Sequence, residues 1–182
     1  MQDQYHIRED DQLIKDCIAG DSVAQKKLYG QYMPAMYNRA VRMVVDREQA
    51  KDLTQEVFTQ VFKDIHRFRG ESTIGAWIKR ITINKCLTFL KTKQKMKLVP
   101  IEEQFDLAME DTPKSTFDVR LIHNAIQELP LGCRTVFNLY LLEGYQHDEI
   151  AQILDISVST SKTQFRRAKM LMQKILKPLR YE

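Results

Sequence analysis

The chain has 182 residues, of which 43% are hydrophobic and 29% are charged, and its formal net charge is +4 at pH 7. This is the balance of one ordinary soluble domain or two small ones, and 6 Gly with 5 Pro are too few for a loop-rich or disordered protein. No apolar run is long enough to cross a membrane, and the polar start MQDQYHIREDD is not a signal peptide. We therefore expect a cytoplasmic protein with no membrane insertion of its own.

Residues that carry metal or redox chemistry are few and scattered. The 3 Cys (Cys17, Cys86 and Cys133) are odd in number and far apart, which indicates reduced thiols buried as small apolar side chains. The 4 His stand singly, and the chain has no phosphate-binding loop. An enzyme therefore lacks support, and we expect no catalytic residues, no metal and no cofactor.

The N-terminal part predicts two helices. Asp10–Ile18 reads as a short helix that ends at Gly20, and Asp21 or Ser22 caps a longer one. Pro34 lies inside this longer helix and should kink or break it. Its apolar face consists of Leu28, Tyr32, Met36 and Tyr37.

A further helix is expected from Asp46, a plausible N-cap. Apolar residues recur at steps of three and four, which gives one buried stripe: Ala50, Leu53, Val57, Val61, Ile65 and Phe68. Polar residues share the opposite face: Asp52, Gln55, Glu56, Thr59 and Lys63. Composition alone favours a solvent-facing role for this polar stripe.

A turn that contains Gly70 then leads to a helix that runs to about Lys95. Between Ser72 and Ile101 there are seven Lys or Arg and no Asp or Glu. Trp77, Asn84 and Phe89 are interleaved with these cations. A basic helix of this kind is typical of a surface that binds a polyanion such as nucleic acid.

The second half of the chain predicts a helix-turn-helix. Helices are expected over residues 116–128, 132–142 and 147–154, and a turn at 155–157 precedes a last helix from about Val158 to Leu176. The stretch Ile156–Tyr181 again has seven Lys or Arg and no acid, whereas Glu102–Asp118 has six acids and one Lys. We predict an all-α protein of two small helical bundles, residues 1–97 and 116–182, joined by an acidic linker at 98–115.

Two stretches of the chain resemble a known family. The run DREQAKDLTQEVFTQVF…FRGESTIGAWIKRITINKCLTFLK is similar to region two of the extracytoplasmic-function (ECF) sigma factors of bacterial RNA polymerase. The block ELPLGCRTVFNLYLLEGYQHDEIAQILDISVSTSKTQFRRAKMLMQKIL resembles region four of the same sigma-70 family. This resemblance implies a factor that binds core RNA polymerase and promoter DNA, recognises and melts a two-part promoter, and is masked by an anti-sigma factor.

The resemblance also implies which residues meet each partner. DLTQEVF matches the family's polymerase-binding motif, so Asp52, Gln55 and Glu56 would dock on the polymerase. The minus-ten element would be captured by a pocket with aromatic and amide walls and by cations along the strand. That surface would comprise Phe68, Arg69, Gly70, Glu71, Ser72, Trp77, Lys79, Arg80, Asn84, Lys85, Thr88 and Lys91. A core role for Trp77 is an equally weighted alternative.

The start of the last helix would read the minus-thirty-five element, because a recognition helix presents its N-terminal residues to base edges and phosphates. The predicted surface comprises Ser157, Ser159, Thr160, Lys162, Thr163, Gln164, Arg166 and Arg167. Four positions depart from the family pattern. Asp155 stands for the usual Gly, Ser161 for an apolar residue, Gln164 for a common Arg, and Thr88 for a frequent Asp.

A stand-alone helix-turn-helix regulator is the alternative. Its N-terminal bundle would then be a sensor or a dimerisation domain. This hypothesis explains the C-terminal half of the chain. It does not explain the second acid-free basic block at Ser72–Ile101 with its Trp and Asn.

Overall fold

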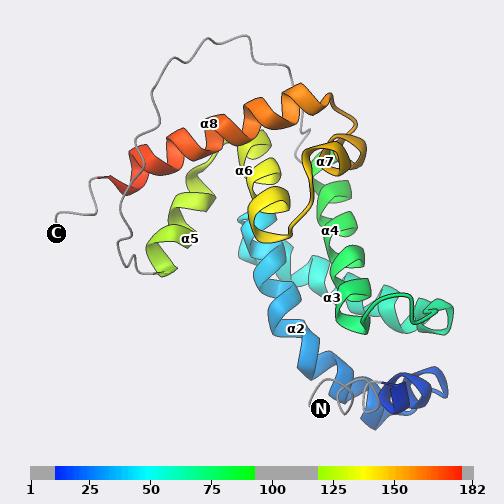
Figure 1. The fold of residues 1–182 in the computed structure, drawn as a ribbon. Helices are drawn as coiled ribbons and strands as arrows, with labels where there is room; N and C mark the ends of the chain where they lie inside the picture. The colour runs from blue at the N-terminus through cyan, green and yellow to red at the C-terminus, as the bar shows by residue number, and fades with distance from the viewer. Residues whose placement is uncertain (1–10, 93–118, 178–182) are drawn as a thin grey trace, which may run out of the picture. The chain divides into compact units, whose positions relative to one another are not determined.

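The computed structural model describes residues 11–92 and 119–177 (Figure 1). Within these two ranges the regular structure is entirely helical, and the chain divides into two compact units, one in each range. The predicted fold class, an all-α protein of two helical bundles, is therefore confirmed. The acidic linker predicted at residues 98–115 lies outside the described residues, and the exact domain limits stay predictions.

The first unit is a bundle of helices packed around one apolar core (Figure 1). Residues 11–18 are helical and are followed by α2 (Ser22–Val44), α3 (Arg47–Asp64), the short 3-10 turn η1 (Ile65–Arg67) and α4 (Ile74–Thr92). Helices α2, α3 and α4 all pack against one another. The core residues include Leu28, Val57, Val61, Ile74 and Ile78, each with almost no exposed surface. Burial of this apolar surface is the main term that holds the unit together.

Two sequence signals in this unit have different outcomes. Asp46 is the N-cap of α3, as predicted, and its carboxylate accepts hydrogen bonds from the amides of Glu48 and Gln49 at 2.9 and 3.1 Å. By contrast, α2 continues through Pro34, so the expected break does not occur. Proline leaves the carbonyl four residues earlier without its helical donor. Here that residue is Gly30, which is exposed, so water can satisfy the carbonyl.

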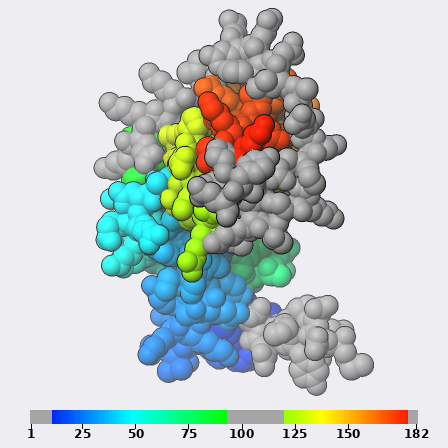
Figure 2. Space-filling view, turned by 90° about the vertical axis from the view of Figure 1, so that its left-hand side faces the viewer, coloured from blue at the N-terminus to red at the C-terminus, as the bar shows by residue number. Residues whose placement is uncertain are grey.

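The second unit packs three helices against the long C-terminal one. It consists of α5 (Val119–Glu128), α6 (Leu131–Phe137), the π-helical turn η2 (Asn138–Leu142), α7 (His147–Leu154) and α8 (Val158–Leu176). Figure 2 shows α5 alongside the C-terminal part of α8, and the core between α5, α6 and α8 is apolar. Its buried members are Ala125, Ile126, Leu129, Cys133, Phe137, Ala168 and Met172.

The helix expected over residues 132–142 is not α-helical throughout. In η2 the amide of Glu143 donates to the carbonyl of Asn138 at 3.0 Å, which spans five residues instead of four. The turn therefore holds one more residue than an α-helical turn. Leu141 and Leu142 are exposed within it.

Helices α7 and α8 form the predicted helix-turn-helix, with the predicted bounds. Asp155 ends α7 in the left-handed conformation, at φ 58° and ψ 54°, which an aspartate adopts at some cost relative to glycine. Ser157 then caps α8, because its hydroxyl accepts from the amide of Thr160 at 3.0 Å. The small core between the helices contains Ile150 and Leu154, which are both buried.

Candidate nucleic-acid and polymerase interfaces

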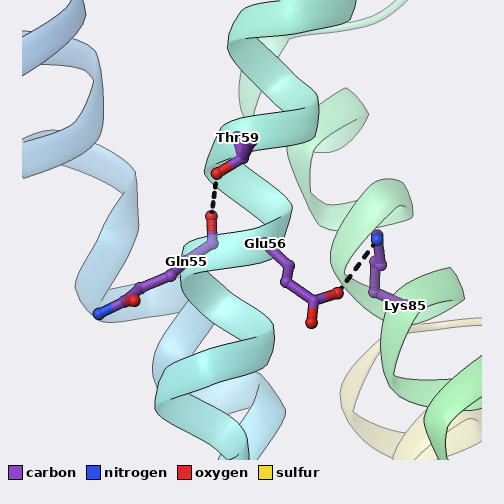
Figure 3. Close-up of polar contacts among 4 residues, drawn as sticks. All are labelled: Gln55, Glu56, Thr59 and Lys85. Carbon is purple, nitrogen blue, oxygen red and sulfur yellow. Dashed lines mark hydrogen bonds and ion pairs between the residues drawn. The ribbon is translucent and has the colours of Figure 1, made fainter.

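The exposed side of α3 carries the predicted polymerase-binding residues. Asp52, Gln55 and Glu56 are all exposed, whereas the other side of α3 faces the core. Figure 3 shows that Gln55 points away from Glu56, and that the hydroxyl of Thr59 bonds to the backbone carbonyl of Gln55, at 2.9 Å. The helix therefore presents an acidic and amide-bearing surface.

Glu56 makes a contact that the sequence did not predict. Its carboxylate oxygen Oε2 lies 3.2 Å from Nζ of Lys85 on α4, and the two side chains point toward one another (Figure 3). The side chains are 59% and 35% exposed for Glu56 and Lys85, respectively, and pairs of this kind contribute about 0.2–1 kcal/mol. Lys85, which was predicted to contact the DNA backbone, is thus paired with a residue of the predicted polymerase surface. An ion pair this weak can break when either side chain meets another partner.

The turn before α4 is short and exposed. Gly70 has φ 72°, a conformation that favours glycine, and the side chains of Arg69 and Glu71 approach to 4.0 Å while both stay exposed. Phe68 and Trp77 flank the turn with ring centroids 5.6 Å apart. Both rings are half-buried against the core of the first unit, so Trp77 is in part a core residue.

The outward face of α4 carries the remaining predicted minus-ten residues. Arg80, Asn84, Thr88 and Lys91 are exposed, and steps of four and three place them on one side of the helix. Lys79 and Lys85 are half-buried, and Ser72 is exposed before the helix begins. One residue was missed: the hydroxyl of Thr73 accepts from the amide of Ala76 at 3.2 Å and caps α4. A Thr just before an apolar periodic stretch was the available signal.

Helix α8 exposes the start of its basic surface. Ser159, Lys162, Thr163 and Arg166 are exposed, and Arg167 is half-buried. These positions recur at steps of three and four, so they share one face of the helix. Ser157, the N-cap, is also exposed and lies at the positive end of the helix dipole. This face has the hydroxyl and cationic groups that contact phosphates and base edges.

Two residues predicted to meet the minus-thirty-five element are buried instead. Gln164 is 4% exposed, and its Oε1 accepts from Sγ of Cys133 on α6 at 3.0 Å. Thr160 is 8% exposed, and its hydroxyl lies 2.8 Å from that of Ser157. The structure thus leaves both side chains little surface with which to contact DNA. Thr160, Gln164 and buried Ala168 follow at steps of four, so they share the face of α8 that packs on the rest of the unit.

The three cysteines are free and buried, as predicted. Burial raises the pKa of the Cys86 thiol to about 12, and burial also raises the pKa of Cys133 and of Cys17. Burial and a raised pKa both favour the unreactive thiol form. In residues 11–92 and 119–177 no group of three His, Cys, Asp or Glu is placed to hold a metal ion. None of the helices described has both the length and the apolarity that a membrane span requires.

The first unit is a helical bundle with a basic face, and the second is a helix-turn-helix with another basic face. This combination is typical of a DNA-binding protein that acts in transcription. Two family models match the chain in order, Sigma-70 region 2 over residues 28–96 and Sigma-70, region 4 over residues 120–172. The chain belongs to the sigma-70 family of RNA polymerase sigma factors. As a member of this family it directs transcription initiation.

Similar proteins place it among the ECF sigma factors. The chain is 28% identical to the RNA polymerase sigma-H factor of Pseudomonas aeruginosa, over 94% of this chain and 95% of that one. It is also 28% identical to the ECF RNA polymerase sigma-E factor of Haemophilus influenzae, over 93% and 96%. The resemblance noted in the sequence is therefore confirmed.

Two solved structures are similar in fold. The sigma factor RpoE, in complex with the anti-sigma factor NepR from Bartonella quintana, has a TM-score of 0.54 at 22% identity, over 84% of this chain and 96% of that one. CnrH, in complex with the cytosolic domain of CnrY, has a TM-score of 0.54 at 18% identity, over 93% and 97%. At these identities the similarity describes the fold alone.

Proposed function

We propose that the chain binds core RNA polymerase through α3, opens the minus-ten element with α4 and the turn before it, and reads the minus-thirty-five element with α8. The observation that carries this proposal is that each unit includes an exposed basic helix without acids, α4 in the first unit and α8 in the second. A regulator with a single DNA-binding surface needs only one of them. On this proposal the chain catalyses no reaction and acts in the cytoplasm.

The region around the turn before α4 has the groups that single-stranded capture requires. Unstacked bases need an apolar or aromatic wall, amide groups, and cations along the backbone. Phe68 and Trp77 provide partly exposed rings on either side of the turn, and Asn84 and Arg80 lie exposed on the helix that follows. We assign base capture to the turn and to Asn84, and backbone contacts to Arg80 and Lys91.

The recognition surface of α8 is narrower than the sequence predicted. With Thr160 and Gln164 buried, we assign base and phosphate contacts to Ser157, Ser159, Lys162, Thr163, Arg166 and Arg167. Each well-formed pair between such a side chain and a base contributes about 1–3 kcal/mol of discrimination. Contacts from the arginines to phosphates contribute affinity that does not depend on sequence.

We also propose that an anti-sigma factor binds this chain and masks its DNA-binding surfaces. RpoE, which is similar in fold, was solved with the anti-sigma factor NepR, and the exposed basic faces of α4 and α8 offer a complementary surface to an acidic partner. Competition between such a partner and DNA for the same cations would keep the factor inactive until the partner is removed.

Transcription in vitro tests the proposed function. A genomic template library is transcribed by core RNA polymerase with and without the protein, and the transcript starts are mapped. New starts downstream of a shared two-part motif, found only with the protein, are the expected result. If no new starts arise and the protein alone binds duplex DNA tightly, the chain is a stand-alone regulator instead.

A further inference from the structure

A polar contact joins the two helices of the helix-turn-helix. His147 is the first residue of α7, and its Nδ1 lies 2.9 Å from the hydroxyl oxygen of Ser161 on α8, fourteen residues later. Ser161 has no exposed surface, and His147 is half-buried. A buried hydroxyl needs a hydrogen-bond partner to offset its lost hydration. The contact with His147 therefore contributes to the packing of α8 against α7.

The imidazole of His147 is itself held by aromatic rings. Tyr140 of η2 stacks on it with a centroid distance of 4.4 Å and an interplanar angle of 16°, and Phe165 of α8 meets it edge-on at 5.7 Å. Tyr140 and Phe165 also contact each other, at 4.5 Å. Aromatic contacts of this kind have defined geometries, so the position of the ring and of Nδ1 is restricted.

These contacts contribute to the rotation of α8 about its own axis, together with the apolar core that α8 shares with α5 and α6. Ser161 and Phe165, one helical turn apart, point toward α7 and η2, whereas Lys162 and Arg166 follow each of them directly and are exposed. Successive residues of an α-helix are about 100° apart around the axis. A helix held at residues 161 and 165 therefore presents residues 159, 162, 163 and 166 outward.

We propose that His147 is a positioning residue for promoter recognition, which sets the rotation of α8 through its contacts with Ser161 and Phe165. The inference deepens the proposed function of α8 and rests on it. His147 touches no base. It acts on sequence discrimination through the angle at which Ser159, Lys162 and Thr163 meet the DNA.

The contact also has an expected pH dependence. Burial lowers the pKa of His147 below its ordinary 6.5, the charge of Lys162 on α8 lowers it further, and Asp148 on α7 acts in the opposite direction. The stacked partner from η2 is Tyr140. The unfolded chain binds a proton at higher pH than the folded one, so stability at this contact falls as the pH drops below 6.5. A histidine that bound phosphate directly would instead strengthen DNA binding on protonation.

The test measures sequence discrimination separately from affinity. The full chain, bound to core RNA polymerase, is offered a random-sequence duplex library, and the best duplex is compared with a scrambled version of it. In the His147→Ala and Ser161→Ala variants we expect the ratio of the two affinities to fall about tenfold, the loss of roughly one base contact. Binding of the scrambled duplex should stay within about twofold, since phosphate contacts do not depend on sequence.

His123→Ala is the matched control. His123 lies on α5 of the same unit, and its ring is 3.4 Å from the amide nitrogen of Gln127 on its own helix. The His123→Ala variant should leave the ratio of the two duplex affinities unchanged. The double variant of His147 and Ser161 should be no worse than either single variant, because the two side chains act through one contact. Between about pH 7.5 and 5.5, the ratio for the wild type should fall, and that for His147→Ala should not.

Unchanged discrimination in both single variants would overturn this inference while the proposed function stands. Affinity that rises for both duplexes as the pH falls, with an unchanged ratio, and only while His147 is present, would identify His147 as a direct phosphate contact and overturn the inference as well. The Ser161→Ala variant controls for misfolding, because it removes only one oxygen atom and should leave the helix intact. A wild-type protein with no sequence preference at all would overturn the proposed function, and this inference with it.

Discussion

Reversing the charge on α3 separates docking on the polymerase from folding. The variant carries Asp52→Lys and Glu56→Lys, two changes on the exposed side of the helix. It removes both acids of the proposed docking surface, which a basic surface of the polymerase would complement in charge. It also breaks the Glu56–Lys85 pair and places a second cation near Lys85, so a cost to stability must be estimated beside the cost to binding.

The two costs differ in size. The Glu56–Lys85 pair is 3.2 Å long and about half exposed to solvent, so its loss costs no more than about 1 kcal/mol. For a domain of this size that is a fall in Tm of about 4–8 °C. At an interface, two reversed charges that face cations cost several kcal/mol, and 3 kcal/mol is already about a hundredfold in Kd. Binding should therefore be lost under conditions in which the protein is folded.

Pull-down with core RNA polymerase measures the binding, and thermal unfolding measures the fold. Lys26→Glu with Lys27→Glu, which reverses two exposed charges on α2, is the control and should retain binding. If the Asp52 and Glu56 variant is still pulled down like the wild type, the docking surface does not lie on this side of α3. If the control loses binding equally, the effect belongs to charge in general.

Three further outcomes follow from the second unit and from the buried thiols. Arg166→Ala with Arg167→Ala should weaken duplex binding and reduce the slope of log affinity against log salt by about one for each lost phosphate contact; an unchanged slope would place both arginines off the DNA. Asp155→Gly should raise the free energy of unfolding by about 0.5–1 kcal/mol, because glycine adopts the left-handed conformation at lower cost, and a fall in Tm would contradict this. Cys86 should react with a thiol reagent only on unfolding, because burial raises its pKa to about 12, against 9.0 in the unfolded chain. Its contribution to the free energy of unfolding should decline as the pH rises above 9. Rapid labelling of the native protein would contradict this.

Much of the fold follows from local signals in the sequence. Asp46 has a side chain that caps a helix, and His147–Leu154 with Val158–Leu176 have apolar periods and a short turn between them, so their bounds were predictable. The predicted break at Pro34 does not occur, and a helix tolerates proline better where the freed carbonyl reaches water. That depends on tertiary exposure, which residue type does not encode.

The candidate site was less predictable, since it depends on which side of each helix is packed. Gln164 is a polar residue in a basic stretch, and the fold places it on the packed face of α8, where its Oε1 accepts from Cys133 on α6. Arg134 is similarly buried, where it donates to the carbonyls of Leu129 and Gln127 at 2.8 and 3.2 Å. The Glu56–Lys85 and His147–Ser161 contacts join different helices, and no local rule predicts them.

The π-helical turn at Asn138–Leu142 affects how relatives of this chain should be compared. A helix acquires such a turn when one residue is inserted and the flanking hydrogen bonds are kept. A homologue without the turn therefore differs by a one-residue gap inside a helix, between Phe137 and Glu143, and not in the loop at Gly144. An alignment that shifts this gap into the loop would pair Leu141 and Leu142 with residues that face another side of the helix.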